Sequence, residues 1–151
     1  MATALAAGGC KKKQDDTGNA ATQVQKSAEG VKDQAKDLDK TLTDKNATPN
    51  DLNKAQGDLA AAKTDLVAAK DKYEVTVKDR LAKIDIKMHE LEARTDAKSK
   101  EEVATLQSRR NELATKVDNV KDHATPDWDA FTKEVDHSFD KLESDLDDAL
   151  K

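Results

Sequence analysis

Three histidines are the residues best suited to metal or acid–base chemistry in this chain. His89, His123 and His137 are the only ones. No two of them are four residues apart, the spacing by which helical histidines chelate zinc. The single cysteine, Cys10, is far from all three, and after Gly9 no two glycines lie close enough to form a phosphate-binding loop. These patterns favour solvated surface histidines, and they predict no metal site, no cofactor and no catalytic residue.

Acidic residues are concentrated at the C-terminal end. Residues 127–151 contain nine Asp or Glu and three Lys, a balance of −6 in a chain whose formal net charge is −5. A carboxylate pair needs a concave pocket to shift its pKa, and a thin helical protein offers none, so we predict no enzyme and no small-molecule substrate. A patch for a basic partner or for loosely bound divalent cations is one hypothesis for this end, and a solvated, fraying helix terminus is the other. The hypothetical patch consists of Asp140, Glu143, Asp145, Asp147 and Asp148.

The first ten residues are small and mostly apolar, and they end in a cysteine. The segment from Leu5 to Cys10 resembles the end of a bacterial lipoprotein signal, in which small residues precede a cysteine that becomes lipidated. Ala7 stands where that family usually has Leu, and nine residues are too few for a charged start and an apolar stretch of roughly 7–15 residues. The resemblance implies a truncated signal at residues 1–10, a lipid anchor on Cys10 and a flexible tether over residues 11–20. A disordered tail with an incidental cysteine is the alternative.

The last residue, Lys151, supports a related hypothesis. Some abundant outer-membrane lipoproteins are short helical coiled coils that end in a lysine joined to peptidoglycan. This chain resembles them in its N-terminal Cys and C-terminal Lys, which implies a wall link through Lys151. The expected location is then the periplasmic face of the cell envelope, or the cytoplasm if Cys10 is not lipidated. No segment approaches the roughly 20 apolar residues that span a bilayer, so we expect membrane contact only through Cys10. The one basic cluster, Lys11 to Lys13, is too short to predict nucleic-acid binding.

The elements that position these residues are predicted to be helices. Charged residues make up 38% of the chain and aromatic residues 3%, as in long helices and coiled coils. Apolar residues recur at steps of three and four, which favours helix over disorder. We predict an all-α helical domain over residues 21–151, with helices at about 21–44, 49–95, 99–123 and 126–150. The second helix is about 45 residues long.

Helix starts can be placed from capping residues. Thr48 suits an N-cap, and the proline after it suits the first helical position. Ser99 with Glu102 three residues later fits a capping box for the third helix. Thr125, again followed by proline, repeats the first signal and predicts the start of the fourth helix.

The apolar seam of the long helix changes character along its length. Leu and Ala alternate strictly from Leu52 to Ala69, and small seam residues let helices approach closely. Two successive steps of four, from Tyr73 to Val77 to Leu81, form a stutter that locally unwinds a supercoil. The larger seam residues that follow predict more helices, or a more distant one, around this second half.

Arg110 is the one polar residue in the seam of the third helix. Two arrangements are open for it. Its stem could pack on the seam while its head reaches water, or it could fix the helix register by pairing with a carboxylate.

Short connections make neighbouring helices antiparallel, and so we predict an elongated antiparallel coiled coil or a three- to four-helix bundle. The first helix is expected on the first half of the long helix, and the third helix on the second half. The fourth helix either completes a bundle with the third, which the larger seam residues favour, or covers the first helix instead. Both arrangements place Trp128 near Tyr73.

A further resemblance covers about half of the chain, from Tyr73 onward. The residues that carry it are Tyr73, Leu81, Ile84, Leu91, Leu106, Arg109, Arg110, Leu113, Trp128, Phe131 and Phe139. This part is similar to a group of small, mostly uncharacterised bacterial coiled-coil proteins, which share a long helical hairpin and a final helix with spaced Trp and Phe. The resemblance implies no activity.

Three functional hypotheses follow. The first is a lipid-anchored spacer, scaffold or protein-interaction module that binds a protein partner or a second copy. The second is a soluble stress-associated protein that shields membranes or other proteins. The third is an apolipoprotein-like lipid binder, although the acidic last helix argues against anionic lipid surfaces.

Overall fold

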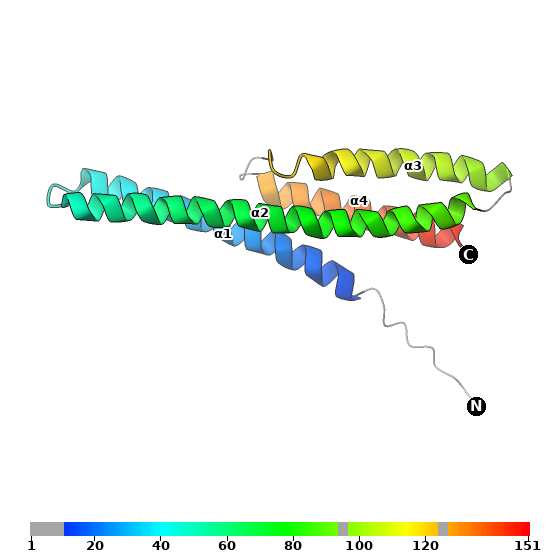
Figure 1. The fold of residues 1–151 in the computed structure, drawn as a ribbon, viewed down its shortest axis with the longest axis horizontal. Helices are drawn as coiled ribbons and strands as arrows, with labels where there is room; N and C mark the ends of the chain where they lie inside the picture. The colour runs from blue at the N-terminus through cyan, green and yellow to red at the C-terminus, as the bar shows by residue number, and fades with distance from the viewer. Residues whose placement is uncertain (1–10, 94–96, 124–126) are drawn as a thin grey trace, which may run out of the picture.

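The described part of the chain forms an elongated bundle of four helices. The computed structural model describes residues 11–93, 97–123 and 127–151, and no strand occurs among them. The helices are α1 (Lys11–Thr43), α2 (Pro49–Glu92), α3 (Ala97–Asp118) and α4 (Trp128–Ala149) (Figure 1). This confirms the all-α fold and the long second helix. With 44 residues, α2 is about 66 Å long at 1.5 Å per residue.

The bundle has two parts of different thickness. α1 and α2 form an antiparallel hairpin, whereas α3 and α4 lie only along the second half of α2 (Figure 1). We call the hairpin over residues 25–69 the arm. The trunk consists of residues 70–93, 97–123 and 127–151, together with the part of α1 up to residue 24. The fourth helix packs on α3 and α2, so the arrangement that the larger seam residues favoured is confirmed.

The start of α2 is fixed by a local capping box. The Thr48 hydroxyl accepts a hydrogen bond from the backbone N–H of Asp51 at 3.2 Å, and the Thr48 backbone N–H donates to the Asp51 carboxylate at 2.9 Å. Pro49 occupies the first helical position, where its missing N–H leaves no broken bond. The predicted N-cap is confirmed. A reciprocal cap of this kind is worth about 1 kcal/mol.

The first helix is longer than its sequence suggested. We expected a flexible tether over residues 11–20, but α1 begins at Lys11. Thr17 and Ala20 are both buried, and they lie seven and four residues before the buried Val24. They therefore continue the three-four seam of α1 toward the N-terminus. The polar composition around them concealed this extension.

The third and fourth helices also differ from the predicted bounds. α3 begins at Ala97, so Ser99 lies inside the helix and is not its N-cap. α3 ends at Asp118 rather than near residue 123, and buried Val120 holds the turn that follows. α4 begins at Trp128 after Asp127, whose side chain makes no capping bond. The Thr125-Pro126 start signal lies outside the described residues.

The hydrophobic core lies in the trunk. Tyr73, Val77, Ile84 and Leu91 of α2 are almost completely buried, whereas the arm residues Leu52, Leu59 and Leu66 are only half-buried. The prediction that more helices pack around the larger seam residues of α2 is therefore confirmed. Leu81 and Met88 of α2 also belong to the trunk core. The remaining core residues come from α1, α3, α4 and the turn after α3: Ala20, Val24, Leu106, Leu113, Val117, Val120, Trp128, Phe131, Val135, Phe139, Leu142 and Leu146.

Trp128 and Tyr73 meet where the arm joins the trunk, which confirms their predicted proximity. Their ring centroids are 5.2 Å apart in an edge-to-face arrangement, and Trp128 also contacts Phe131 at 5.6 Å. Aromatic pairs of this geometry contribute about 1 kcal/mol beyond their buried area. Lys70 reaches over the Trp128 ring and donates a hydrogen bond to the His123 carbonyl at 2.8 Å. The end of the α3 segment is thereby tied to α2.

Candidate functional site

One arginine of α2 is buried in the trunk. This residue, Arg80, lies two heptads after Leu66. It therefore shares a row of α2 with the leucines of the arm. The stutter turns the apolar seam away from this row, and basic side chains continue it. The row consists of Leu52, Leu59, Leu66, Tyr73, Arg80 and Lys87.

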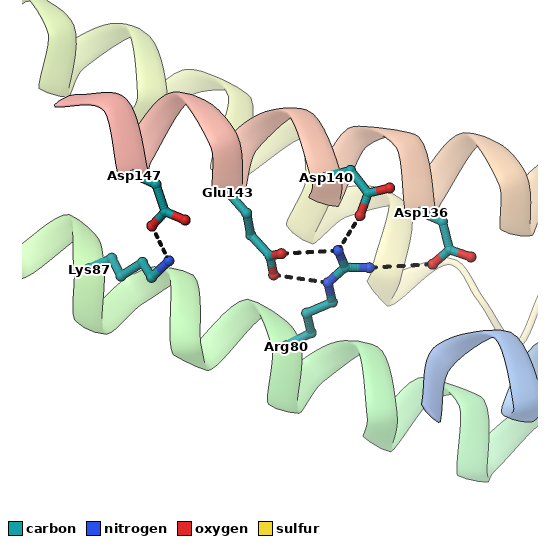
Figure 2. A network of polar contacts seen from close by, with 6 residues as sticks. All are labelled: Arg80, Lys87, Asp136, Asp140, Glu143 and Asp147. Carbon is teal, nitrogen blue, oxygen red and sulfur yellow. Dashed lines mark hydrogen bonds and ion pairs between the residues drawn. The ribbon is translucent and has the colours of Figure 1, made fainter. Parts of the chain in front are cut away.

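Three carboxylates of α4 surround the Arg80 guanidinium (Figure 2). Glu143 accepts hydrogen bonds from Nε at 2.9 Å and from Nη2 at 3.1 Å, and Asp140 accepts from Nη2 at 2.5 Å. Asp136 lies 3.6 Å from Nη1, and the Phe139 ring centroid is 4.7 Å from the guanidinium carbon. The Arg80 side chain is only 6% exposed. Such a charge is stable in the core only because its partners supply both charge and hydrogen bonds.

The acidic row of α4 follows from its apolar row. Asp136, Asp140, Glu143 and Asp147 each come directly after a buried residue of the α4 core. They therefore form a parallel stripe beside that core, at steps of four, three and four. Figure 2 shows this stripe facing Arg80 and Lys87 on α2, where Lys87 pairs with Asp147. The acidic stripe of α4 thus faces basic residues of α2.

Burial and charge shift the pKa values of this cluster. Burial lowers the pKa of Arg80, but its hydrogen bonds with Glu143 and Asp140 outweigh burial, and the net pKa is raised. Burial raises the pKa of Asp136, although the charge of Arg80 opposes this. Burial, and then the charge of Asp136, raise the pKa of Tyr73 above its usual range. The cluster therefore keeps Arg80 charged and the Tyr73 phenol neutral.

All five residues of the hypothetical acidic patch form ion pairs within the chain. Asp140 and Glu143 pair with Arg80, and Asp147 with Lys87. Asp145 pairs with Arg109 of α3, while Asp148 lies 2.7 Å from the ammonium of Lys151. The helix end carries many acids because it faces cations of α2 and α3. A basic partner would have to compete with these intramolecular pairs.

Of the two predicted attachment residues, the structure describes Lys151 but not Cys10. The Lys151 ammonium is exposed, and its hydrogen bond with Asp148 raises its pKa. Cys10 lies outside the described residues. Both the lipid anchor and the wall link therefore remain predictions.

Arg110 forms a pair across the α2–α3 contact. Its Nε and Nη2 atoms each donate to Asp85 at 2.6 Å, and this bond raises the pKa of Arg110. Of the two arrangements predicted for Arg110, the structure therefore shows the one in which it pairs with a carboxylate and fixes the helix register. Two parallel bonds fix the relative height of the two helices, which a head in free solvent cannot do.

The histidines do not come together. His89 is exposed and lies 3.1 Å from Glu92 on its own helix, His137 is exposed, and His123 stacks on Phe131 with ring centroids 4.1 Å apart. Within the described ranges, no three His, Cys, Asp or Glu side chains are grouped so that they could hold a metal ion. None of the helices found there combines the length and the apolarity that crossing a bilayer requires.

Arg80, the central residue of this site, was missed in the sequence because it lies outside the three-four apolar seam of α2. The signal was present in the seven-residue steps from Tyr73 to Arg80 to Lys87, and in the acid that follows each core residue of α4. Chemically, the arrangement is a charge clamp that holds α4 on α2.

No family model, curated protein or solved structure matches the chain. The arm and the trunk are therefore the features from which a function can be inferred.

Proposed function

We propose that the chain is a non-enzymatic helical spacer and protein-interaction module, held at the periplasmic face of a membrane by lipid on Cys10. One observation carries the interaction role. The arm is a two-helix projection whose leucines are half-buried or exposed, while the trunk encloses a core of buried residues and is braced by ion pairs. A projecting apolar face on a braced base suits the docking of another protein.

The spacer role is supported by the length and bracing of α2. It runs through both arm and trunk (Figure 1), and the charge clamp at Arg80 and the Arg110–Asp85 pair hold it to two other helices. The anchor role is supported by the sequence before Lys11. Because α1 begins at Lys11, a lipid on Cys10 would attach almost directly to the rod. Lys11 to Lys13 would then lie at the membrane surface, where basic residues contribute about 1 kcal/mol each on anionic lipid.

Lipidation is tested by expressing the chain behind a complete lipoprotein signal, with Cys10→Ser as the control. Both proteins are labelled with an alkyne fatty acid and separated by membrane flotation. The expected result is label and flotation for the parent and neither for Cys10→Ser. A parent protein without label would contradict the anchor.

The spacer is tested by the distance between two spin labels on α2. In a Cys10→Ser background, Asn53→Cys and His89→Cys place labels on two exposed positions about 54 Å apart along the helix axis. Labelled protein is diluted into unlabelled protein, so that only distances within one chain are measured. We expect one narrow distance peak. A broad distribution reaching short distances would show a hinge and contradict a rigid spacer.

A second candidate is an amphipathic protein that binds lipid or shields other proteins. The observation that favours it is the exposure of Leu42 and Val67 on the arm, at 61% and 59%. Adding phosphatidylcholine vesicles, with or without phosphatidylglycerol, tests it. Lipid entering the arm would shift the emission of Trp128, whereas the spacer predicts unchanged emission and circular dichroism. Suppression of heat aggregation of an unrelated protein tests the shielding role.

A further inference from the structure

The two faces of the arm differ in chemistry. One face carries an apolar groove of about 490 Å³ whose walls include Ala28, Val31 and Ala35 of α1, Leu66 of α2 and the Trp128 side chain. The opposite face of the arm carries a second groove. Its walls are polar and include Asp37, Lys40, Asp51, Lys54 and Asp58. The hairpin is therefore amphipathic as a unit.

The apolar face continues to the tip of the arm. Seven residues are nearly two full turns, so residues seven apart lie on one stripe of a helix. On α1, the groove residues Ala28 and Ala35 lead by this step to Leu42, which is 61% exposed. On α2, Leu66 leads back to Leu59 and Leu52, which are half-buried.

The groove lies at the end of α4. Trp128 and Asp129, the first two residues of α4, form its trunk end. In Figure 1, α4 starts about midway along α2, and only the hairpin continues beyond it. A helical element laid in the groove would therefore extend the bundle beyond the N-terminal end of α4.

We propose that the occupant of this face is the arm of a second copy, laid antiparallel so that the two arms form a four-helix bundle between two trunks. This inference rests on the proposed interaction role and names the partner for it. An antiparallel pairing places the tip of each arm beside Trp128 of the other copy. The bundle then stays four helices thick along its whole length.

The available area fits a weak, specific dimer. From Gln25 to Thr43, α1 is about 28 Å long, and two helices side by side are about 20 Å wide. Each copy thus offers about 560 Å², and the pair would bury about 1,100 Å², near the lower limit for a specific interface. An interface of this size is typical of weak or transient association, and its affinity depends on packing and charge complementarity rather than on area.

The charges of the arm are self-complementary. Residues 25–69 contain seven lysines and eight acids, so two arms do not repel each other as two copies of residues 127–151 would. A two-fold axis beside Ala35 brings Asp39 level with the partner subunit's Lys32. Lys32 borders the groove, and Asp39 lies seven residues from it on the same stripe. Each dimer would contain this pair twice.

Sedimentation equilibrium of the full chain tests the proposal, with reductant present so that Cys10 cannot link two copies. The key variant is Ala35→Arg, and the matched control is Ala61→Arg on the Lys54 stripe of the polar face. Both alanines are exposed, and each is followed four residues later by an aspartate. Their local helix effects are therefore similar, and circular dichroism of both variants should match that of the parent.

The expected result is a reversible dimer that Ala35→Arg weakens at least tenfold and Ala61→Arg leaves unchanged. A charge swap gives a second readout. Asp39→Lys should weaken association roughly threefold to tenfold, and adding Lys32→Asp should restore it. A monomer up to about 1 mM, equal weakening by both arginine variants, or no rescue by the swap would each overturn the proposal. Lipidation at Cys10 is measured separately, so loss of the dimer and loss of the anchor are distinguishable.

Discussion

The charge clamp gives the sharpest prediction, because replacing Arg80 removes one cation from three carboxylates at once. Arg80→Met keeps most of the apolar stem and deletes the guanidinium. Removing one partner of a buried ion pair costs about 3–5 kcal/mol. Asp136 and Glu143 are 26% and 24% exposed, and Asp140 is 46% exposed. Water can therefore partly solvate all three, and we expect a loss near the lower limit, about 3 kcal/mol.

The loss is measured by urea unfolding, followed through Trp128 fluorescence and helical circular dichroism. For a chain of this length, about 3 kcal/mol corresponds to a fall of roughly 6–12 °C in Tm. Lys87→Met is the matched control, because it lies on the same row of α2 and also faces an acid of α4. Its pair with Asp147 is substantially exposed, so its loss should stay below about 1 kcal/mol.

The dependence on pH separates the clamp from simple packing. Burial already raises the pKa of Asp136, and replacing Arg80 removes the charge that opposes this shift. The penalty is then fully present at neutral pH, and it declines as the pH falls through the raised pKa of Asp136 and this acid becomes neutral. A cost of Arg80→Met below about 1 kcal/mol at pH 7, or the same cost at pH 4, would contradict the charge clamp.

Three further predictions concern single positions. Thr48→Ala removes the cap of α2 and should cost about 1 kcal/mol, with faster amide exchange in the first turn of α2; unchanged exchange would contradict the cap. Gly57→Ala, at a helical position with no atom within 4 Å of the added methyl, should stabilise the arm by about 1 kcal/mol in thermal unfolding, and a lower Tm would contradict the open space. Tyr73→Phe removes a buried hydroxyl with no hydrogen-bond partner among the described residues, so the urea midpoint should stay level or rise; a clear fall would reveal a bond to that hydroxyl.

Much of the fold could be predicted because helical periodicity is local. The three-four spacing of apolar residues indicated four helices, and the change from alanine to larger seam residues correctly predicted where α3 and α4 gather. Boundaries were less accurate. α1 extends to Lys11 because Thr17 and Ala20 are buried in the bundle, which composition alone does not indicate. Ser99 lies inside α3 rather than at its start.

The candidate site was predictable only in part. An acidic last helix is visible in the sequence, but its role depends on what faces it. The same residues that suggested a patch for a basic partner are paired with Arg80, Lys87, Arg109 and Lys151. Except for Asp148 with Lys151, the paired residues are 36 or more positions apart, so the pattern on one helix alone does not show which residues will pair.

Local residue spacing was enough to predict the helices, their approximate lengths, the cap at Thr48 and the half of α2 on which a thicker bundle forms. Each depends on residues within a few turns of one another, where spacing alone decides which side chains share a face. Three outcomes depend on how the helices pack: Arg80 is enclosed by α4, Arg110 pairs with Asp85, and the arm keeps one apolar face uncovered. Those outcomes depend on the rotation and height at which separate helices meet, and many combinations of rotation and height satisfy the same heptad pattern.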